Sequence, residues 1–159
     1  MKKFKTKVLV LGNCSTGKTS LLQSYCSNGT SFPKDYVMTQ ACEITSKILP
    51  NEKANKDLEY FFFDVSGHEL YDSFHEELFK EAKAVIYVFD VTNEESFQSV
   101  NKWKDLVQKY VKSDIPSIMI GNKIDLNSAR TIDMGTATNL ARSFRAEYFE
   151  TSAVTICNP

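Results

Sequence analysis

The stretch Gly12-Asn-Cys-Ser-Thr-Gly-Lys-Thr19 constrains this chain more than any other part of its sequence. It matches the pattern G-x-x-x-x-G-K-[ST] in full, between an apolar strand over residues 7–11 and a helix over Lys18–Cys26. In that setting successive backbone N–H groups form an anion nest, and Lys18 can reach the β and γ phosphates of a nucleotide. An ordinary glycine-rich turn is the competing interpretation. The predicted phosphate-binding residues are Gly12, Asn13, Cys14, Ser15, Thr16, Gly17, Lys18, Thr19 and Ser20.

The hydrophobic pattern along the chain predicts the fold class. Short apolar strands alternate with amphipathic helices, which favours an α/β fold with a mostly parallel sheet and helices on both faces. The predicted strands cover residues 7–11, 42–49, 58–63, 84–89, 117–120 and 147–150. The predicted helices cover residues 18–26, a segment that begins with a capping box at Thr92–Glu95 and runs to Tyr110, and residues 133–145. We expect one domain over residues 1–159, with the helix that normally covers the last strand missing.

Composition and charge exclude several function classes. The chain has 159 residues with 19 Lys+Arg and 20 Asp+Glu, so a net charge of −1 gives no electrostatic reason to expect nucleic acid. The basic start, MKKFKTK, is interpreted as a solvated lead-in to a strand, because the apolar run after it is too short for a signal peptide or membrane span. The four cysteines have no C-x-x-C spacing, which argues against zinc and favours reduced thiols in the cytoplasm.

A second set of candidate ligands follows the strand over residues 58–63. Asp64 ends this strand, where a carboxylate can hold Mg²⁺ through water, and Gly67 lets a backbone N–H reach a phosphate. Thr39, in the long polar loop after the first helix, can supply a hydroxyl to Mg²⁺ when the γ-phosphate is present. A strand-capping Asp and a solvated loop Thr are the alternatives. We expect Mg²⁺ at Thr19, Thr39 and Asp64.

Two later strand ends carry residues suited to a guanine base. Within Asn122-Lys-Ile-Asp125, the Asp125 carboxylate can accept hydrogen bonds from guanine N1–H and its exocyclic amine, whereas adenine would leave it unpaired. The aliphatic stem of Lys123 can lie on the base. After the last strand, backbone N–H groups of Glu150-Thr-Ser-Ala153 could meet guanine O6, unless this is an ordinary turn. The predicted base site is Asn122, Lys123, Asp125, Ser152, Ala153 and Val154.

These motifs, in this order, resemble those of the Ras-superfamily small GTPases. Within the superfamily the chain resembles the Rab branch, and more narrowly the Rab-like GTPases of the intraflagellar transport B complex. The narrower resemblance is carried by Phe32-Pro-Lys-Asp-Tyr-Val-Met-Thr39, Gly67-His-Glu-Leu-Tyr71, Asp90-Val-Thr-Asn-Glu-Glu-Ser-Phe97, Lys102-Trp103 and Phe149-Glu-Thr-Ser152.

The resemblance implies a P-loop G-domain fold, binding of GTP and GDP with Mg²⁺, and switch loops around Thr39 and residues 64–74. It also implies a heterodimer with the small β-sandwich subunit, intraflagellar transport protein 25, a place in the B complex, and a location in cilia or flagella. Exchange and activating proteins are possible regulators.

The chain departs from the family pattern in ways that bear on activity. His68 stands where most members have Gln, Cys14 where many have Gly, and Val154 where a Lys usually packs over the base. Cys157-Asn-Pro is not a prenylation motif, so no lipid anchor is visible, as in the intraflagellar GTPases; truncation would explain this equally well.

His68 has three interpretations. Hydrolysis is slow because the water-orienting amide is missing, an effect that Cys14 would strengthen by crowding the γ-phosphate. Alternatively His68 itself orients water with a pH-dependent rate, since translational GTPases also carry Gly-His after their metal-binding Asp. Third, it is an exposed loop residue without a role. The function classes left open are a GTP-hydrolysing switch (intraflagellar or a vesicle-trafficking Rab), a nucleotide-bound scaffold without significant hydrolysis, and, distantly, a P-loop kinase or ATPase.

Overall fold

A six-stranded sheet organises the chain in the computed structural model, which describes residues 3–31, 35, 37–51 and 56–155. The strand order is β2-β3-β1-β4-β5-β6; β2 and β3 are antiparallel, and all other neighbouring strands are parallel. The strands are β1 (Lys3–Leu11), β2 (Cys42–Asn51), β3 (Lys56–Val65), β4 (Ala84–Asp90), β5 (Ser117–Asn122) and β6 (Glu147–Glu150). The helices are α1 (Lys18–Cys26), η2 (Glu69–Phe74), α2 (His75–Phe79), α3 (Glu94–Gln98), α4 (Val100–Tyr110), η3 (Ile124–Ala129) and α5 (Met134–Ser143).

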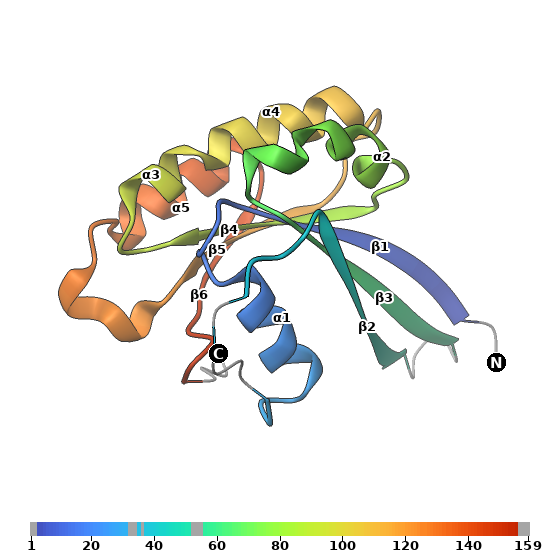
Figure 1. Cartoon of the computed structure of the whole chain (residues 1–159), viewed down its shortest axis with the longest axis horizontal. Coiled ribbons are helices and arrows are strands. Elements are labelled where there is room, and N and C mark those ends of the chain that lie inside the picture. Colours follow the sequence, from blue (N-terminus) through green and yellow to red (C-terminus); the bar gives the residue numbers. More distant parts are fainter. Residues whose placement is uncertain (1–2, 32–34, 36, 52–55, 156–159) are drawn as a thin grey trace.

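Helices lie on both faces of this sheet, as the alternating pattern predicts. Helix α1 lies against one face, and α2, α3, α4 and α5 lie together against the other (Figure 1). The larger core forms under the second group, where Phe79, Phe89 and Trp103 pack with strand residues such as Leu9 and Val85. This is the predicted G-domain fold. The helices cover the two faces of the sheet and leave the carboxyl ends of the central parallel strands free to carry a ligand site.

The helical segment after β4 differs from the prediction in its cap and its continuity. Thr92 is not the cap: its N–H and hydroxyl both donate to Oδ1 of Asp90. Asn93 caps α3 instead, and its Oδ1 accepts from the backbone N–H of Ser96 at 2.9 Å. The predicted single helix is divided at Ser99, whose hydroxyl donates to the Glu95 carbonyl at 2.8 Å, a back-bonding contact that bends helices.

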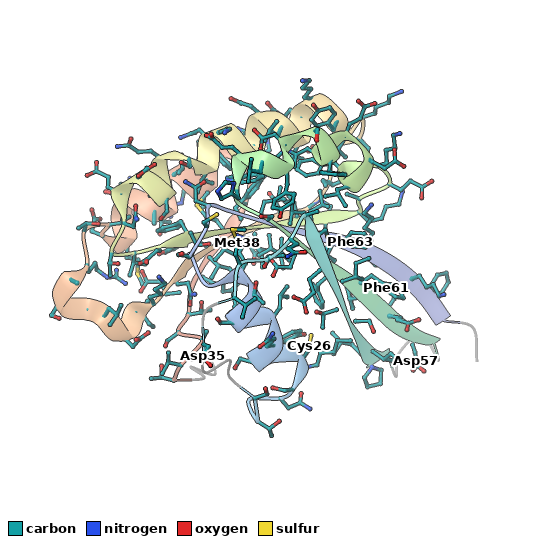
Figure 2. The ribbon with its side chains drawn as sticks, viewed as in Figure 1. Cys26, Asp35, Met38, Asp57, Phe61 and Phe63 are labelled. Carbon is teal, nitrogen blue, oxygen red and sulfur yellow. The ribbon has the colours of Figure 1, made fainter. Side chains whose placement is uncertain are left out.

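Lys5 and Lys7 belong to the sheet rather than to a solvated lead-in. Strand β1 begins four residues before the predicted start, and the ammonium groups of Lys5 and Lys7 lie 5.7 and 4.3 Å from the ring centres of Phe61 and Phe63 on β3. Figure 2 shows both aromatic side chains along that strand. The two lysines thus lie over aromatic surface of β3; Lys5 is exposed, whereas the Lys7 ammonium donates to the Lys80 carbonyl at 2.8 Å and burial lowers its pKa.

Strand β2 is an edge strand, as its alternation predicts. Its apolar residues are not buried, however: Ile44 and Ile48 are 57% and 44% exposed. Two internal segments lie outside the described residues: residues 52–55 between β2 and β3, and residues 32–34 and 36 of the long polar loop that the sequence predicts after the first helix. The expectation of a missing final helix likewise concerns the chain beyond Thr155. Among the described residues, no helix is long and apolar enough to cross a membrane.

Candidate nucleotide and magnesium site

A cavity of about 780 Å³ opens between the loop that joins β1 to α1, the segment before β2, and the end of β3. Gly17 begins α1 with φ +89°, and a Cβ there would collide with the Asn122 side chain, so glycine is required. Met38 and Asp35, labelled in Figure 2, line the cavity from the segment between α1 and β2. The predicted residues that line it are Cys14, Ser15, Gly17, Lys18, Thr19, Ser20, Thr39, Gly67 and Lys123.

Lys18 is buried within the phosphate loop. Its ammonium group donates to the carbonyl oxygens of Gly12 and Asn13 at 2.8 and 2.9 Å, and the Thr16 hydroxyl also donates to the Asn13 carbonyl. Burial lowers the pKa of Lys18, an effect that the nearby charge of Asp64 partly opposes. The loop therefore holds a cation inside the nest, as an anionic phosphate ligand requires.

Three oxygen-bearing side chains from separate segments meet beside the loop. The Thr19 hydroxyl donates to Oδ2 of Asp64 and lies 3.0 Å from the Thr39 hydroxyl. Oδ1 of Asp64 is buried and has no hydrogen-bond partner in the described part of the chain. Burial raises the pKa of Asp64, against the attraction of Lys18 and the hydrogen bond from Thr19. Hydroxyl and carboxylate oxygens with an unsatisfied buried acceptor fit Mg²⁺, which is ligated by oxygen.

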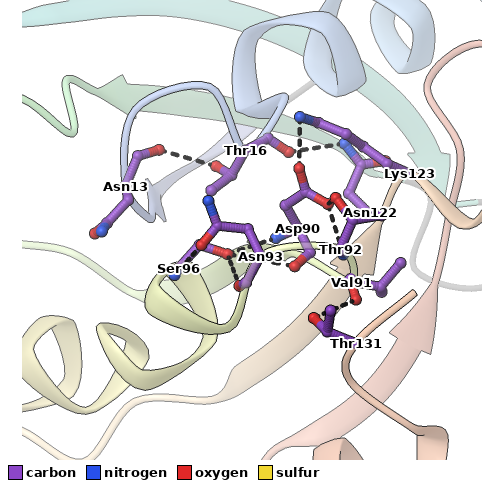
Figure 3. A network of polar contacts seen from close by, with 10 residues as sticks. All are labelled: Asn13, Thr16, Asp90, Val91, Thr92, Asn93, Ser96, Asn122, Lys123 and Thr131. Atoms are coloured by element: carbon purple, nitrogen blue, oxygen red, sulfur yellow. Dashed lines mark hydrogen bonds and ion pairs between the residues drawn. The ribbon is translucent and has the colours of Figure 1, made fainter. Parts of the chain in front are cut away.

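The last residue of β5, Asn122, is joined to the phosphate loop by one hydrogen bond, which Figure 3 draws. Nδ2 of Asn122 donates to the Thr16 carbonyl at 2.9 Å, and its Oδ1 accepts from the Thr151 hydroxyl at 3.2 Å. Lys123 has a left-handed backbone, φ +68°, and its ammonium group lies 2.6 Å from Oδ2 of Asp90. Burial alone would raise the pKa of Asp90, but hydrogen bonds from Lys123 and Thr92 hold it below its ordinary value.

The remaining predicted base residues form a second cluster, next to Lys123 rather than in the cavity itself. The Ser152 hydroxyl donates to Oδ1 of Asp125 at 2.6 Å and accepts from the backbone N–H of Val154 at 3.2 Å. Asp125 is exposed, Ala153 is buried, and the Val154 side chain is 61% exposed. Asp125 thus has one carboxylate oxygen fixed by Ser152 and an open side, which suits recognition of a planar base.

His68 does not line the cavity in this structure. It begins η2, and its Nδ1 accepts a hydrogen bond from the backbone N–H of Leu70 at 3.2 Å. Its own N–H donates to the Ser66 hydroxyl at 3.3 Å. The His68 ring therefore serves as a helix cap.

Sequence reasoning missed several residues that shape the site. Asp90 fixes Lys123, and Trp103 and Ser99 bind the Asn13 side chain. Asp90 could have been found from its place at the end of the strand beside β5, where Asp90 pairs with Asn122 in the register. No local signal links Trp103 to Asn13, because 90 residues separate them.

Known proteins give an independent view of the same chain. Residues 7–158 match the Ras family. The chain is 35% identical to an intraflagellar transport protein 27 homolog of Mus musculus over 153 residues, which cover 96% of this chain and 82% of the mouse protein. It is 30% identical to the homolog from Trypanosoma brucei brucei over 154 residues, 97% of this chain and 83% of that protein.

A Rab protein is similar as well. The chain is 34% identical to the Ras-related protein Rab-3 of Caenorhabditis elegans over 147 residues, which cover 92% of this chain and 65% of Rab-3. The family match covers more than nine-tenths of the sequence, and it agrees with the sheet order and the phosphate loop described above. The chain belongs to the Ras family of small GTPases and is similar to the intraflagellar transport protein 27 homologs within it.

Proposed function

We propose that residues 1–159 act as one G domain, a guanine-nucleotide switch that binds GTP and GDP with Mg²⁺ and hydrolyses GTP slowly. The observation that carries this is the meeting of Thr19, Thr39 and Asp64 beside a phosphate loop with a buried lysine. Thr39 belongs to the segment between α1 and β2, and a P-loop protein that is not a switch has no need of a residue from that segment beside the phosphate loop. Because Thr39 contacts Thr19, the loop before β2 can be ordered when a γ-phosphate and Mg²⁺ are bound and released when they are not. This favours a switch over a kinase.

In this proposal Lys18 and the backbone N–H groups of the loop hold the β and γ phosphates, while Thr19, Thr39 and Asp64 hold the cation. Mg²⁺, when bound, neutralises charge on the phosphates. Asp125, fixed by Ser152, selects guanine, and Lys123, fixed by Asp90, lies beside it. The chain's own contribution to hydrolysis is positioning and electrostatic stabilisation, since it needs no covalent chemistry.

Slow hydrolysis is supported by the position and the hydrogen bond of the His68 ring. Its Nδ1 is engaged with Leu70, and the ring does not line the cavity that would hold the γ-phosphate, whereas Cys14 does. Water orientation by Nε2 after a loop rearrangement is the competing account, and it requires the imidazole to leave its position as the cap or to rotate there.

The test is single-turnover hydrolysis of pre-bound GTP with Mg²⁺ across pH 5.5 to 8.5. Turnover of about 10⁻⁴ s⁻¹ or less, flat with pH and unchanged in His68→Ala, is the expected result. Faster turnover that rises with pH and disappears in His68→Ala would make His68 the water-positioning residue. Failure of the wild-type chain to retain GDP at all would refute the nucleotide proposal itself.

We further propose that the chain is a subunit of an intraflagellar transport B complex, paired with a β-sandwich partner of the intraflagellar transport protein 25 type, and therefore ciliary or flagellar. The support is similarity to proteins named for intraflagellar transport. Similarity to Rab-3 supports the alternative of a vesicle-trafficking Rab. Size-exclusion chromatography with the β-sandwich subunit of the same organism discriminates them: co-elution at 1:1 supports the first, and separate elution favours the second.

A further inference from the structure

The side chain of Asn13 binds Trp103 on helix α4 and Ser99, the residue that precedes this helix. Oδ1 of Asn13 accepts from the indole N–H of Trp103 at 3.1 Å, and its Nδ2 donates to the Ser99 hydroxyl at 2.9 Å. The backbone of the same residue faces the site, because its carbonyl accepts from Lys18 at 2.9 Å. Asn13 therefore joins the position of the phosphate loop to the position of α4.

The start of the segment after β3 rests on the same residue. Gly67 lies against the backbone of the phosphate loop so closely that a Cβ would stand 2.6 Å from the Gly12 carbonyl oxygen, and closer still to the backbone of Asn13 and Cys14. Any movement of Gly67 toward the phosphate loop must therefore displace the loop, and any movement of the loop toward Gly67 must displace Gly67.

The far end of that segment reaches Asn13 through Trp103. His75, the first residue of α2, is 1% exposed, and its ring packs on the Trp103 indole with a centroid distance of 5.4 Å. Nε2 of His75 is buried and has no hydrogen-bond partner among the described residues, whereas Nδ1 lies 3.8 Å from Oδ1 of Asp72. The ring is therefore held by packing on Trp103 and Phe79 together with this contact. Trp103 is 4% exposed, and it is the single tryptophan of the chain.

From these contacts we infer that Asn13 and Trp103 are positioning residues that tie both ends of the segment 67–75 to the phosphate loop. Gly67 meets the Asn13 backbone directly, and His75 meets the Asn13 side chain through the indole. A rearrangement of this segment when GTP replaces GDP moves Trp103 relative to Asn13, and loss of the Asn13–Trp103 bond loosens the loop around the nucleotide. The inference rests on the proposed nucleotide switch and adds a regulatory link to it.

The experiment compares four variants with wild type. Asn13→Ala removes the bonds to both Trp103 and Ser99, whereas Asn13→Asp keeps the acceptor for Trp103 and loses only the donor to Ser99, whose hydroxyl already donates to the Glu95 carbonyl. Trp103→Phe keeps a ring against His75 but removes the donor. Asn101→Ala is the matched control, since Asn101 is exposed on the same helix and bonds only to the Gln98 carbonyl among the described residues.

Two readouts are used: the dissociation rate of a fluorescent GDP analogue with Mg²⁺, and the Trp103 emission change when GDP is replaced by a non-hydrolysable GTP analogue. The expected result is GDP release roughly three- to tenfold faster in Asn13→Ala and Trp103→Phe, the size expected for losing one or two hydrogen bonds. Asn13→Asp, which keeps the bond to Trp103, should recover part of the Asn13→Ala loss, and Asn101→Ala should match wild type. The emission change should be present in wild type and reduced by at least half in Asn13→Ala.

Urea unfolding of the GDP-bound proteins separates a positioning role from a general loss of stability. If release rates follow unfolding midpoints across all four variants, or if the emission change in Asn13→Ala equals that of wild type, the link does not exist. If wild type shows no GDP retention, the proposed function has failed, and that result differs from every outcome that concerns the link alone.

Discussion

Replacing Gly67 with alanine should weaken nucleotide binding through a steric conflict that can be located on individual atoms. The added Cβ would lie 2.6 Å from the carbonyl oxygen of Gly12 and nearer to the backbone of the next two residues. All of these neighbours are backbone atoms, so no side-chain rotation relieves the conflict. The φ angle of Gly67 is not positive. The cost of the substitution therefore comes from contact with the phosphate loop and not from backbone conformation.

The size of the effect follows from the distance. The Gly12 carbonyl would have to retreat by about 0.8 Å to reach 3.4 Å, the near limit of ordinary van der Waals contact. Overpacking of this kind typically costs about 1–3 kcal/mol. The atoms that must move belong to the loop that is predicted to hold phosphate, so we expect the cost to appear as a fall in GDP affinity of roughly 5- to 150-fold.

The assay is equilibrium titration with a fluorescent GDP analogue in excess Mg²⁺, accompanied by urea unfolding without nucleotide. Gly135→Ala is the matched control: a Cβ there approaches the Asp133 side chain at 3.0 Å, and alanine suits the first turn of α5. Gly135→Ala should bind GDP like wild type. Equal affinity of Gly67→Ala and Gly135→Ala, with unchanged unfolding midpoints, would refute the reasoning.

Three further predictions concern specificity and stability. Asp125→Asn should lower affinity for GDP by at least roughly a hundredfold, because a carboxylate pairs with the guanine donors and an amide does not. It should raise affinity for xanthosine diphosphate, whose base has a carbonyl in place of the exocyclic amine; competition binding measures both. Burial lowers the pKa of His75, so the unfolded chain takes up a proton that the folded chain excludes. Stability should thus fall as pH drops below about 6.5, by at most about 1.4 kcal/mol per pH unit, and His75→Leu should remove that slope in urea unfolding at pH 7.5 and 5.5. Arg130→Met should lower the free energy of unfolding by about 2–3 kcal/mol in the same assay, because the guanidinium makes two hydrogen bonds to Glu150, at 3.0 and 2.8 Å, in a largely buried pair. Lys80→Met is the control: it breaks an exposed pair with Glu77 and should change the unfolding free energy little.

The parts of the fold that the sequence predicts are those with local causes. Helix α1 has the predicted bounds because the glycine before it and the lysine that starts it belong to the phosphate motif itself. The buried strands were found because uniform apolar runs have few other solutions. The helix cap was placed one residue early because Thr92 and Asn93 are both good caps, and the choice depends on Asp90, which takes up the Thr92 donors.

What could not be predicted depends on pairs that are distant along the chain. Lys5 and Lys7 look like a solvated basic tail until β3 places Phe61 and Phe63 beneath them. In the same way, Asn13 reads only as a loop residue between two glycines, whereas the structure uses its amide to bind Trp103. The candidate phosphate and metal residues could be named from sequence because their motif spacing is fixed by the ligand. The residues that hold them in place could not, because many scaffolds can hold the same constellation.

The two roles available to His68 can be separated by a substitution that keeps the cap and removes the imidazole. Asparagine accepts backbone N–H bonds at helix starts as well as any residue, so His68→Asn should retain the bond to Leu70 that His68→Ala loses. If the cap is all that His68 provides, GTP hydrolysis and GDP release in His68→Asn should match wild type at every pH, and only His68→Ala should loosen the start of η2. If the imidazole orients water, His68→Asn should hydrolyse as slowly as His68→Ala, because a capped segment without a titratable nitrogen has lost the group that acts on the water. Because an Asn amide could itself orient water, wild-type turnover in His68→Asn excludes a catalytic imidazole only if His68→Ala, which has no polar group at this position, turns over equally fast.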